Sequence, residues 1–126
     1  GTYDETVEID TPNLTILGAA HGTSGGSRPY DQSAAFDLSA ETVVKGLEAP
    51  PKYSGYGNDG RFILGPDADG TVVDGFYFDY ATGAEGVTSG PIVHLQAGAD
   101  GVTLGNNVFS RNDNDGNNKN EIRIDA

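Results

Sequence analysis

The feature that most constrains this chain is a short motif that recurs along its whole length. Each copy is a triplet of residues that favour β-strands, one variable residue, and then a glycine or an asparagine. Such a triplet reads as a short strand whose outer two residues face one side and whose middle residue faces the other. Glycine and asparagine tolerate positive φ, so a tight bend is expected after each strand. The expected bends are at Gly18, Gly46, Gly75 and Asn106.

The residues two positions before the expected bends predict one interior column, and apolar residues before each triplet predict another. Successive residues of the first column are 28, 29 and 31 positions apart. Each repeat reads as strand, turn, strand, tight bend, strand and long loop, which is typical of one coil of a parallel β-helix. The two columns are Ile16, Val44, Val73 and Leu104, and Ile9, Leu38, Leu64, Leu95 and Ile124.

The repeat predicts an all-β fold, a right-handed single-stranded parallel β-helix of about four coils of 28–31 residues. We interpret residues 1–126 as a single β-helix domain. An antiparallel sandwich also has strands at short intervals, but it does not explain the regular glycine and asparagine positions. No capping helix is predicted at either end, so we interpret the chain as a fragment or as a module of an axial assembly.

Acidic residues dominate the charge, with 19 acidic and 7 basic residues and a net charge of −12. Such a surface repels nucleic acid and anionic membranes, so neither is an expected partner. No apolar run is long enough for membrane insertion. The absence of cysteine excludes disulfides and thiolate metal sites. The charge suits divalent cations, a salty medium or solubility alone.

Three parts of the sequence resemble coils of the pectin-lyase-like superfamily, which includes pectinesterases, pectate lyases and surface β-helix repeat proteins. Residues 1–9 with 14–19 are similar to its opening coil, and residues 73–78 and 102–109 are similar to its later coils. The resemblance implies a right-handed parallel β-helix. It carries over no catalytic residue, because these motifs belong to the coil and not to an active site.

The long loop that follows the third strand of each repeat forms the expected variable face, where solenoid proteins commonly bind their ligands. Tyrosine rings stack on sugar faces, so the tyrosines in the first two loops predict a polysaccharide partner. The alternative is that these rings pack the loops onto the barrel. The candidate carbohydrate-binding residues are Tyr30, Tyr53, Tyr56 and Arg28.

Clusters of aspartate and asparagine beside glycine make calcium a candidate cofactor, because hard oxygen ligands in a tight turn suit this ion. The same dipeptides are also ordinary turn formers, which is the alternative explanation. Neither the EF-hand spacing nor the RTX nonapeptide is present. The candidate calcium ligands are Asp113, Asp115, Asp67 and Asp69.

No catalytic set is recognisable in the sequence. His94 alternates with Val93 and Leu95, which predicts that His94 faces solvent. We therefore expect a non-catalytic extracellular or cell-surface module, structural or adhesive, that presents its loops to polysaccharide or assembles end to end into a filament with further copies. The alternative is a fragment of a carbohydrate-active enzyme, either a polysaccharide lyase or a pectinesterase-like enzyme.

Overall fold

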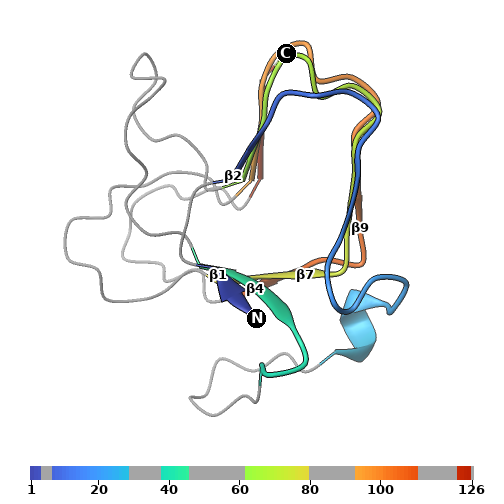
Figure 1. Cartoon of the computed structure of the whole chain (residues 1–126), viewed down its shortest axis with the longest axis vertical. Helices are drawn as coiled ribbons and strands as arrows, with labels where there is room; N and C mark the ends of the chain where they lie inside the picture. The colour runs from blue at the N-terminus through green and yellow to red at the C-terminus, as the bar shows by residue number, and fades with distance from the viewer. Residues whose placement is uncertain (4–6, 29–37, 46–61, 80–92, 111–121, 126) are drawn as a thin grey trace, which may run out of the picture.

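Three parallel β-sheets, here called A, B and C, make up the structure, a computed structural model that describes residues 1–3, 7–28, 38–45, 62–79, 93–110 and 122–125. Successive strands pass from sheet to sheet in turn, so each sheet collects every third strand. Viewed along the stack, the traces of successive turns overlay one another (Figure 1). The described residues contain no α-helix and one 3₁₀ turn, η1 (Gly25–Ser27).

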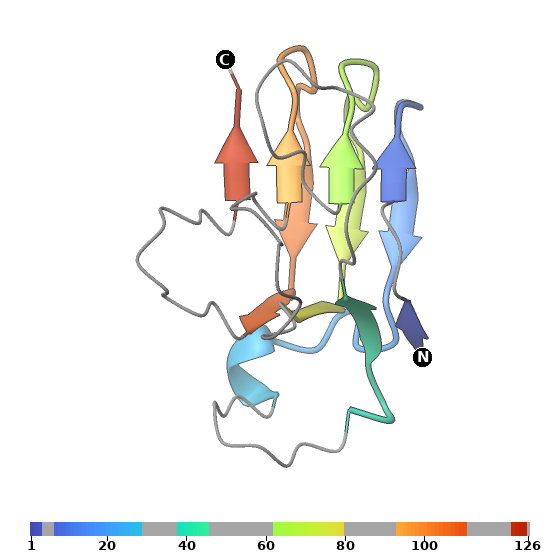
Figure 2. The ribbon, with the colours of Figure 1, turned by 90° about the vertical axis from the view of Figure 1, so that its left-hand side faces the viewer.

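The strands among the described residues are short, and every pair that they form is parallel. Sheet A has the order β1 (Thr2–Tyr3), β4 (Thr42–Lys45), β7 (Phe76–Asp79) and β10 (Val108–Ser110). Sheet B has the order β2 (Val7–Ile9), β5 (Phe62–Leu64), β8 (Val93–Leu95) and β11 (Ile122–Ile124), which Figure 2 shows side by side. Sheet C has the order β3 (Thr15–Leu17), β6 (Val72–Asp74) and β9 (Thr103–Gly105).

Three consecutive strands, one from each sheet, form what we call a tier. The first tier is β2, β3 and β4, the second is β5, β6 and β7, and the third is β8, β9 and β10. Parallel tiers stacked in register are compatible with a β-solenoid. Strand β1 precedes the first tier and β11 follows the third.

Apolar side chains stacked between the sheets form the core. The predicted column of sheet B is confirmed in register for Ile9, Leu64, Leu95 and Ile124, of which the first three are buried and Ile124 is 72% exposed on the edge strand. That of sheet C is confirmed for three, because Ile16, Val73 and Leu104 are in register. An aromatic cluster adds to this core, with ring centroids 5.1–5.9 Å apart. Its members are Phe62, Phe76, Phe78 and Phe109.

Two residues were assigned to the wrong columns. Val44 does not stack on the residues of sheet C, because it lies in sheet A between Tyr3 and Phe78. Leu38 does not belong to the column of sheet B, because it packs instead against a second apolar cluster around Tyr77. The triplet that contains Val44 therefore belongs to the third strand of the first tier and not to a tier of its own.

An insertion in the first tier explains both errors. The step from Ile9 to Leu64 is 55 residues, whereas the next two steps along sheet B are the expected 31 and 29. In the chain, 22 residues separate Gly18, after β3, from Glu41, before β4, and without them the first step would be 33. The predicted repeat of 28–31 residues thus holds only after the first tier.

The bends between sheets C and A differ between the tiers. Gly75 alone lies between β6 and β7, whereas Asn106 and Asn107 lie between β9 and β10. Gly75 and Asn106 have positive φ values of 80° and 48°. Gly18 occupies the equivalent level of the first tier, but it is not among the described residues with positive φ. A Cβ atom on Gly18 would lie 2.3 Å from the carbonyl oxygen of Gly75, so close approach of the backbone requires glycine there. Gly46 lies outside the described residues.

Candidate functional site

The strap, as we call residues 18–28, crosses the corner between sheets C and A and borders the candidate site (Figure 1). Its first residues bind the second tier, since the N–H of Gly18 donates to the carbonyl of Asp74 (2.7 Å) and that of Ala20 to Gly75 (3.3 Å). Its 3₁₀ turn reaches the third tier, where a Cβ atom on Gly25 would lie 3.0 Å from the carbonyl oxygen of Asn107. The strap therefore spans the tiers along their outer corner.

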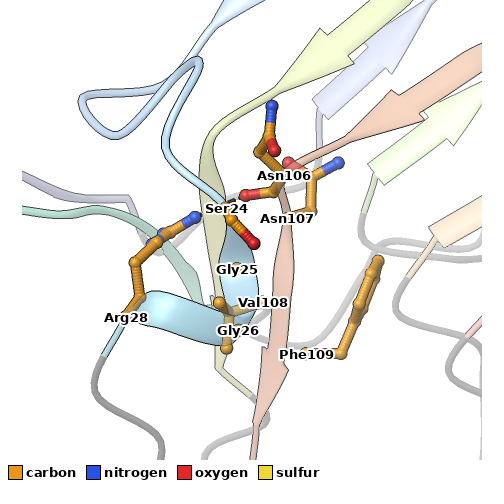
Figure 3. Close-up of a pocket in the computed structure, with 8 residues that line it drawn as sticks. All are labelled: Ser24, Gly25, Gly26, Arg28, Asn106, Asn107, Val108 and Phe109. Atoms are coloured by element: carbon orange, nitrogen blue, oxygen red, sulfur yellow. Dashed lines mark hydrogen bonds between the residues drawn. The ribbon is translucent and has the colours of Figure 1, made fainter.

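An open hollow of about 650 Å³ lies between the strap and the third tier (Figure 3). One wall comes from the 3₁₀ turn and the other from the bend and strand β10. The lining residues are Ser24, Gly25, Gly26, Arg28, Asn106, Asn107, Val108 and Phe109.

Arg28, predicted to bind carbohydrate, lines this hollow but is held by the protein itself. Its Nε donates to Glu41 Oε1 (3.0 Å), and its Nη2 donates to Glu41 Oε2. Its Nη1 donates to the carbonyl oxygen of Asn106 (2.5 Å). The side chains of Arg28 and Glu41 are only 4% and 9% exposed. All three guanidinium nitrogens therefore donate to protein atoms, which gives Arg28 a structural role in this structure.

The two asparagines of the hollow are also engaged within the fold. Asn106 Nδ2 donates to Asp74 Oδ1 (2.7 Å). Asn107 Nδ2 donates to the carbonyl of Val73 (2.9 Å), and its Oδ1 accepts from the N–H of Phe76 (2.9 Å). These bonds join the third tier to the second.

Ser24 and Phe109 remain as the side chains with which the hollow could contact a ligand. The exposed Ser24 makes no capping hydrogen bond, and Phe109 is partly buried with its ring stacked on Phe78. A hydroxyl group and an aromatic ring suit a neutral, sugar-like ligand better than a charged one. The sequence patterns did not indicate either residue.

A second polar cluster lies on sheet B, where β8 and β11 pair. His94 Nε2 lies 2.8 Å from Asp125 Oδ2, and Arg123 Nε donates to Asp125 Oδ1 at 2.8 Å. Because a carboxylate only accepts, Nε2 carries a proton. Hydrogen bonds from Arg123 first, and then from His94, hold the pKa of the Asp125 carboxyl below its ordinary value.

The prediction that His94 faces solvent is wrong, because the residue is only 5% exposed. Its Nδ1 atom is buried without a hydrogen-bond partner. Ile63, its register partner on β5, is likewise buried at 3% exposure. Alternation along β8 indicates the face on which a side chain lies, but it does not indicate whether that face is covered.

The aspartates of the turns between sheets B and C form links between tiers. Asp10 Oδ1 accepts from the N–H of Asp67 (3.3 Å), and Asp69 Oδ1 accepts from the N–H of Asp100 (2.9 Å). Among the described residues, no group of three or more histidine and acidic side chains is placed to hold a metal ion. Asp67 and Asp69 therefore take part in turn and tier contacts.

The remaining candidates fall where the structure gives no description. Tyr30, Tyr53 and Tyr56, predicted to bind carbohydrate, lie outside the described residues. Asp113 and Asp115, predicted calcium ligands, do so as well. The sequence patterns did not indicate Glu41 or Asp125. Arg123 and Asp125 are two positions apart, a spacing that places side chains on the same face of a strand, so it was a usable signal for Asp125.

The chain was compared with protein family models, curated proteins and solved structures, and none of them matches it. Among the residues that the structure describes, no helix is long and apolar enough to cross a membrane.

Proposed function

We propose that the chain is a non-catalytic β-solenoid module of an extracellular or cell-surface protein, with a structural or adhesive role. It is built as a right-handed parallel β-helix similar to those of the pectin-lyase-like superfamily. The parallel sheets, stacked in register, support this architecture.

One observation carries the proposal: turn carboxylates of one tier accept hydrogen bonds from the next. Asp10 of the first tier accepts from the second tier, and Asp69 of the second tier accepts from the third. Asp74 accepts in the same way from Asn106. Polar groups used to join neighbouring repeats are what a scaffold requires, whereas a catalyst needs several of them converging on a substrate.

Polysaccharide is the ligand that we propose for the loops and for the hollow beside the strap. The tyrosines of the loops and the ring and hydroxyl of the hollow are suited to sugars. The excess of acidic residues disfavours polyanionic glycans and favours neutral or cationic ones.

The edge strands offer a second means of association, through end-to-end contact. Tyr3 of β1, Leu17 of β3 and Ile124 of β11 are 50%, 52% and 72% exposed. Among the described strands, all three lie at the edge of their sheets, where backbone groups are available for pairing. A further tier could stack there, whether it belongs to the same polypeptide or to another copy.

Two measurements on the purified chain test the proposal. One is binding of neutral and acidic polysaccharides, and the other is turnover of uronate polymers in the presence of calcium. We expect binding of at least one neutral glycan, weakened by Tyr53→Ala with Tyr56→Ala, and no turnover. Sedimentation at increasing concentration tests end-to-end contact, and Ile124→Lys should reduce any association. A chain that binds no glycan and stays monomeric at high concentration would contradict the proposal.

The second candidate is a fragment of a carbohydrate-active enzyme, a polysaccharide lyase or pectinesterase-like enzyme. The observation that favours it is the hydrogen-bonded pair of His94 and Asp125, since a carboxylate that orients an imidazole is a common arrangement for proton transfer. Turnover of a uronate polymer that is abolished by His94→Gln would establish this candidate and overturn the first.

A further inference from the structure

The interruption of the first tier places Glu41 and Asn106 at one level of the fold. Thr42 is in register with Phe76, and Tyr77 with Val108. By extension of these registers, Glu41 lies level with Gly75 of the second tier and with Asn106 of the third. Glu41 therefore lies at the same corner level as Gly75 and Asn106, a level that it shares in the first tier with Gly18 on the other side of the insertion.

Arg28 connects the first and third of these positions directly. Its guanidinium forms a two-point ion pair with Glu41 and also donates to the carbonyl oxygen of Asn106. The first tier is held further by the terminal amine of Gly1, which donates to the carbonyl oxygen of Glu41 (2.8 Å). One side chain of the strap thus bonds to two tiers that are not neighbours in the stack.

The strap also packs closely on the second tier that lies between them. A Cβ atom on Gly75 would lie 2.1 Å from the backbone nitrogen of His21, so the strap lies directly on the bend. The N–H of Gly22 donates to Asp74 Oδ2 (3.1 Å), and the other oxygen of Asp74 accepts from Asn106. Asp74 therefore joins the strap and the third tier through one carboxylate.

Burial makes the contact of Arg28 costly to break. Both side chains of the ion pair are more than nine-tenths buried, so water does not replace a lost partner. Removal of one member of such a pair leaves an uncompensated charge inside the protein. In most repeat proteins, by contrast, each repeat contacts only its neighbours and the ends fray separately.

We propose that the strap is a clamp that ties the first tier to the third through Arg28, so that the three tiers open as one unit. This inference concerns how the fold opens and does not depend on the ligand of the module. It assigns a role to the insertion that interrupts the repeat: the insertion provides a contact between tiers that are not neighbours in the stack.

Native-state hydrogen exchange of the whole chain tests the clamp. In the unmodified protein, amides of β4 and β10 should show the same opening free energy and the same dependence on denaturant. In Glu41→Gln, which leaves the charge of Arg28 buried, the amides of β4 and of β10 should both exchange on the order of a hundredfold faster. Asp69→Asn is the matched control, since it weakens one contact between neighbouring tiers, and its effect should stay near the turn.

The clamp would be overturned if Glu41→Gln accelerated hydrogen exchange in β4 and the strap but left the exchange of β10 unchanged. If Glu41→Gln does not fold, the unmodified protein decides the question. Different denaturant dependences for β4 and β10 would then contradict the proposal, and identical ones would support it.

Discussion

Arg28 and Glu41 form a buried two-point ion pair at the corner where the first tier is interrupted. The pair joins residues 13 positions apart in the chain, one in the strap and one immediately before β4. The other two tiers make this bend with one or two residues, so the pair stabilises a connection that only the insertion in the first tier makes long.

Glu41→Ala should lower the free energy of unfolding by about 3–5 kcal/mol, because it leaves a buried guanidinium without its counter-charge. Urea denaturation measures the change. Asp100→Asn, a substitution at an exposed turn residue, should change stability by less than about 0.5 kcal/mol. Replacing the pair by Arg28→Met with Glu41→Leu should recover most of the loss. A single variant as stable as the unmodified protein would contradict the buried pair.

Gly75→Ala should be more destabilising than Gly22→Ala. Both glycines have positive φ, at 80° and 72°, so both substitutions incur the left-handed strain of about 1–2 kcal/mol. Only Gly75 also lies against the strap, whereas a Cβ atom on Gly22 would meet nothing within 4 Å. Thermal unfolding of the two variants gives the difference. Equal losses would show that the strap does not lie on the bend.

Phe78→Ala should destabilise the fold by about 3–5 kcal/mol, because a fully buried ring leaves a cavity between three aromatic neighbours. Leu17→Ala is the control, since Leu17 is 52% exposed on an edge strand, and it should cost less than about 1 kcal/mol. Chemical denaturation separates the two. Comparable losses would mean that the interior and exterior of the sheets are assigned incorrectly.

The repeat of strand triplets and bends was sufficient to predict parallel strands and most of both interior columns. The columns were right wherever one tier follows another without insertion, as from Leu64 to Leu95. They failed at Val44, because the sequence Thr-Val-Val-Lys-Gly suits a strand of any sheet. The β-propensity of a strand triplet does not indicate to which sheet the strand belongs. The insertion also places Val44 by chance 28 residues after Ile16, which is the spacing of one repeat.

The site was less predictable than the fold. The sequence predicted Arg28 as a ligand-binding residue and did not predict its three contacts with Glu41 and Asn106, which are 13 and 78 positions away. Contacts between residues so distant in sequence depend on the path of the strap, which no local pattern encodes. The burial of His94 depended in the same way on tertiary structure and not on the alternation within β8.

Asp125→Asn should reduce stability at neutral pH and have little effect in strong acid. The pKa of the Asp125 carboxyl is lower in the folded protein than its unfolded value of about 4. A lowered pKa contributes stability above the unfolded value, and that stability is lost as pH falls through the folded value. Unfolding free energies of both proteins, measured from pH 7 down to pH 2, should therefore converge. A constant difference across this range would contradict the hydrogen bonds to Asp125.

If the aspartate turns that make calcium a candidate cofactor bind this ion, calcium should raise the melting temperature beyond the effect of ionic strength. Calorimetry with calcium, with a chelator and with sodium chloride of equal ionic strength separates binding from screening of the net charge of −12. Asp113→Asn with Asp115→Asn should abolish the calcium effect, and Asp67→Asn with Asp69→Asn is the matched comparison. Equal melting temperatures in calcium and sodium would exclude this cofactor.

Engineered cysteine pairs test the register of the tiers most directly, because the chain has no cysteine of its own. Thr15 is in register with Val72 in sheet C, whereas Val43 lies in sheet A. Adjacent parallel strands are about 4.8 Å apart, within the range that a disulfide spans. Thr15→Cys with Val72→Cys should therefore form a disulfide under mild oxidation, and Thr15→Cys with Val43→Cys should not. Crosslinking of the second pair but not the first would contradict the interrupted first tier.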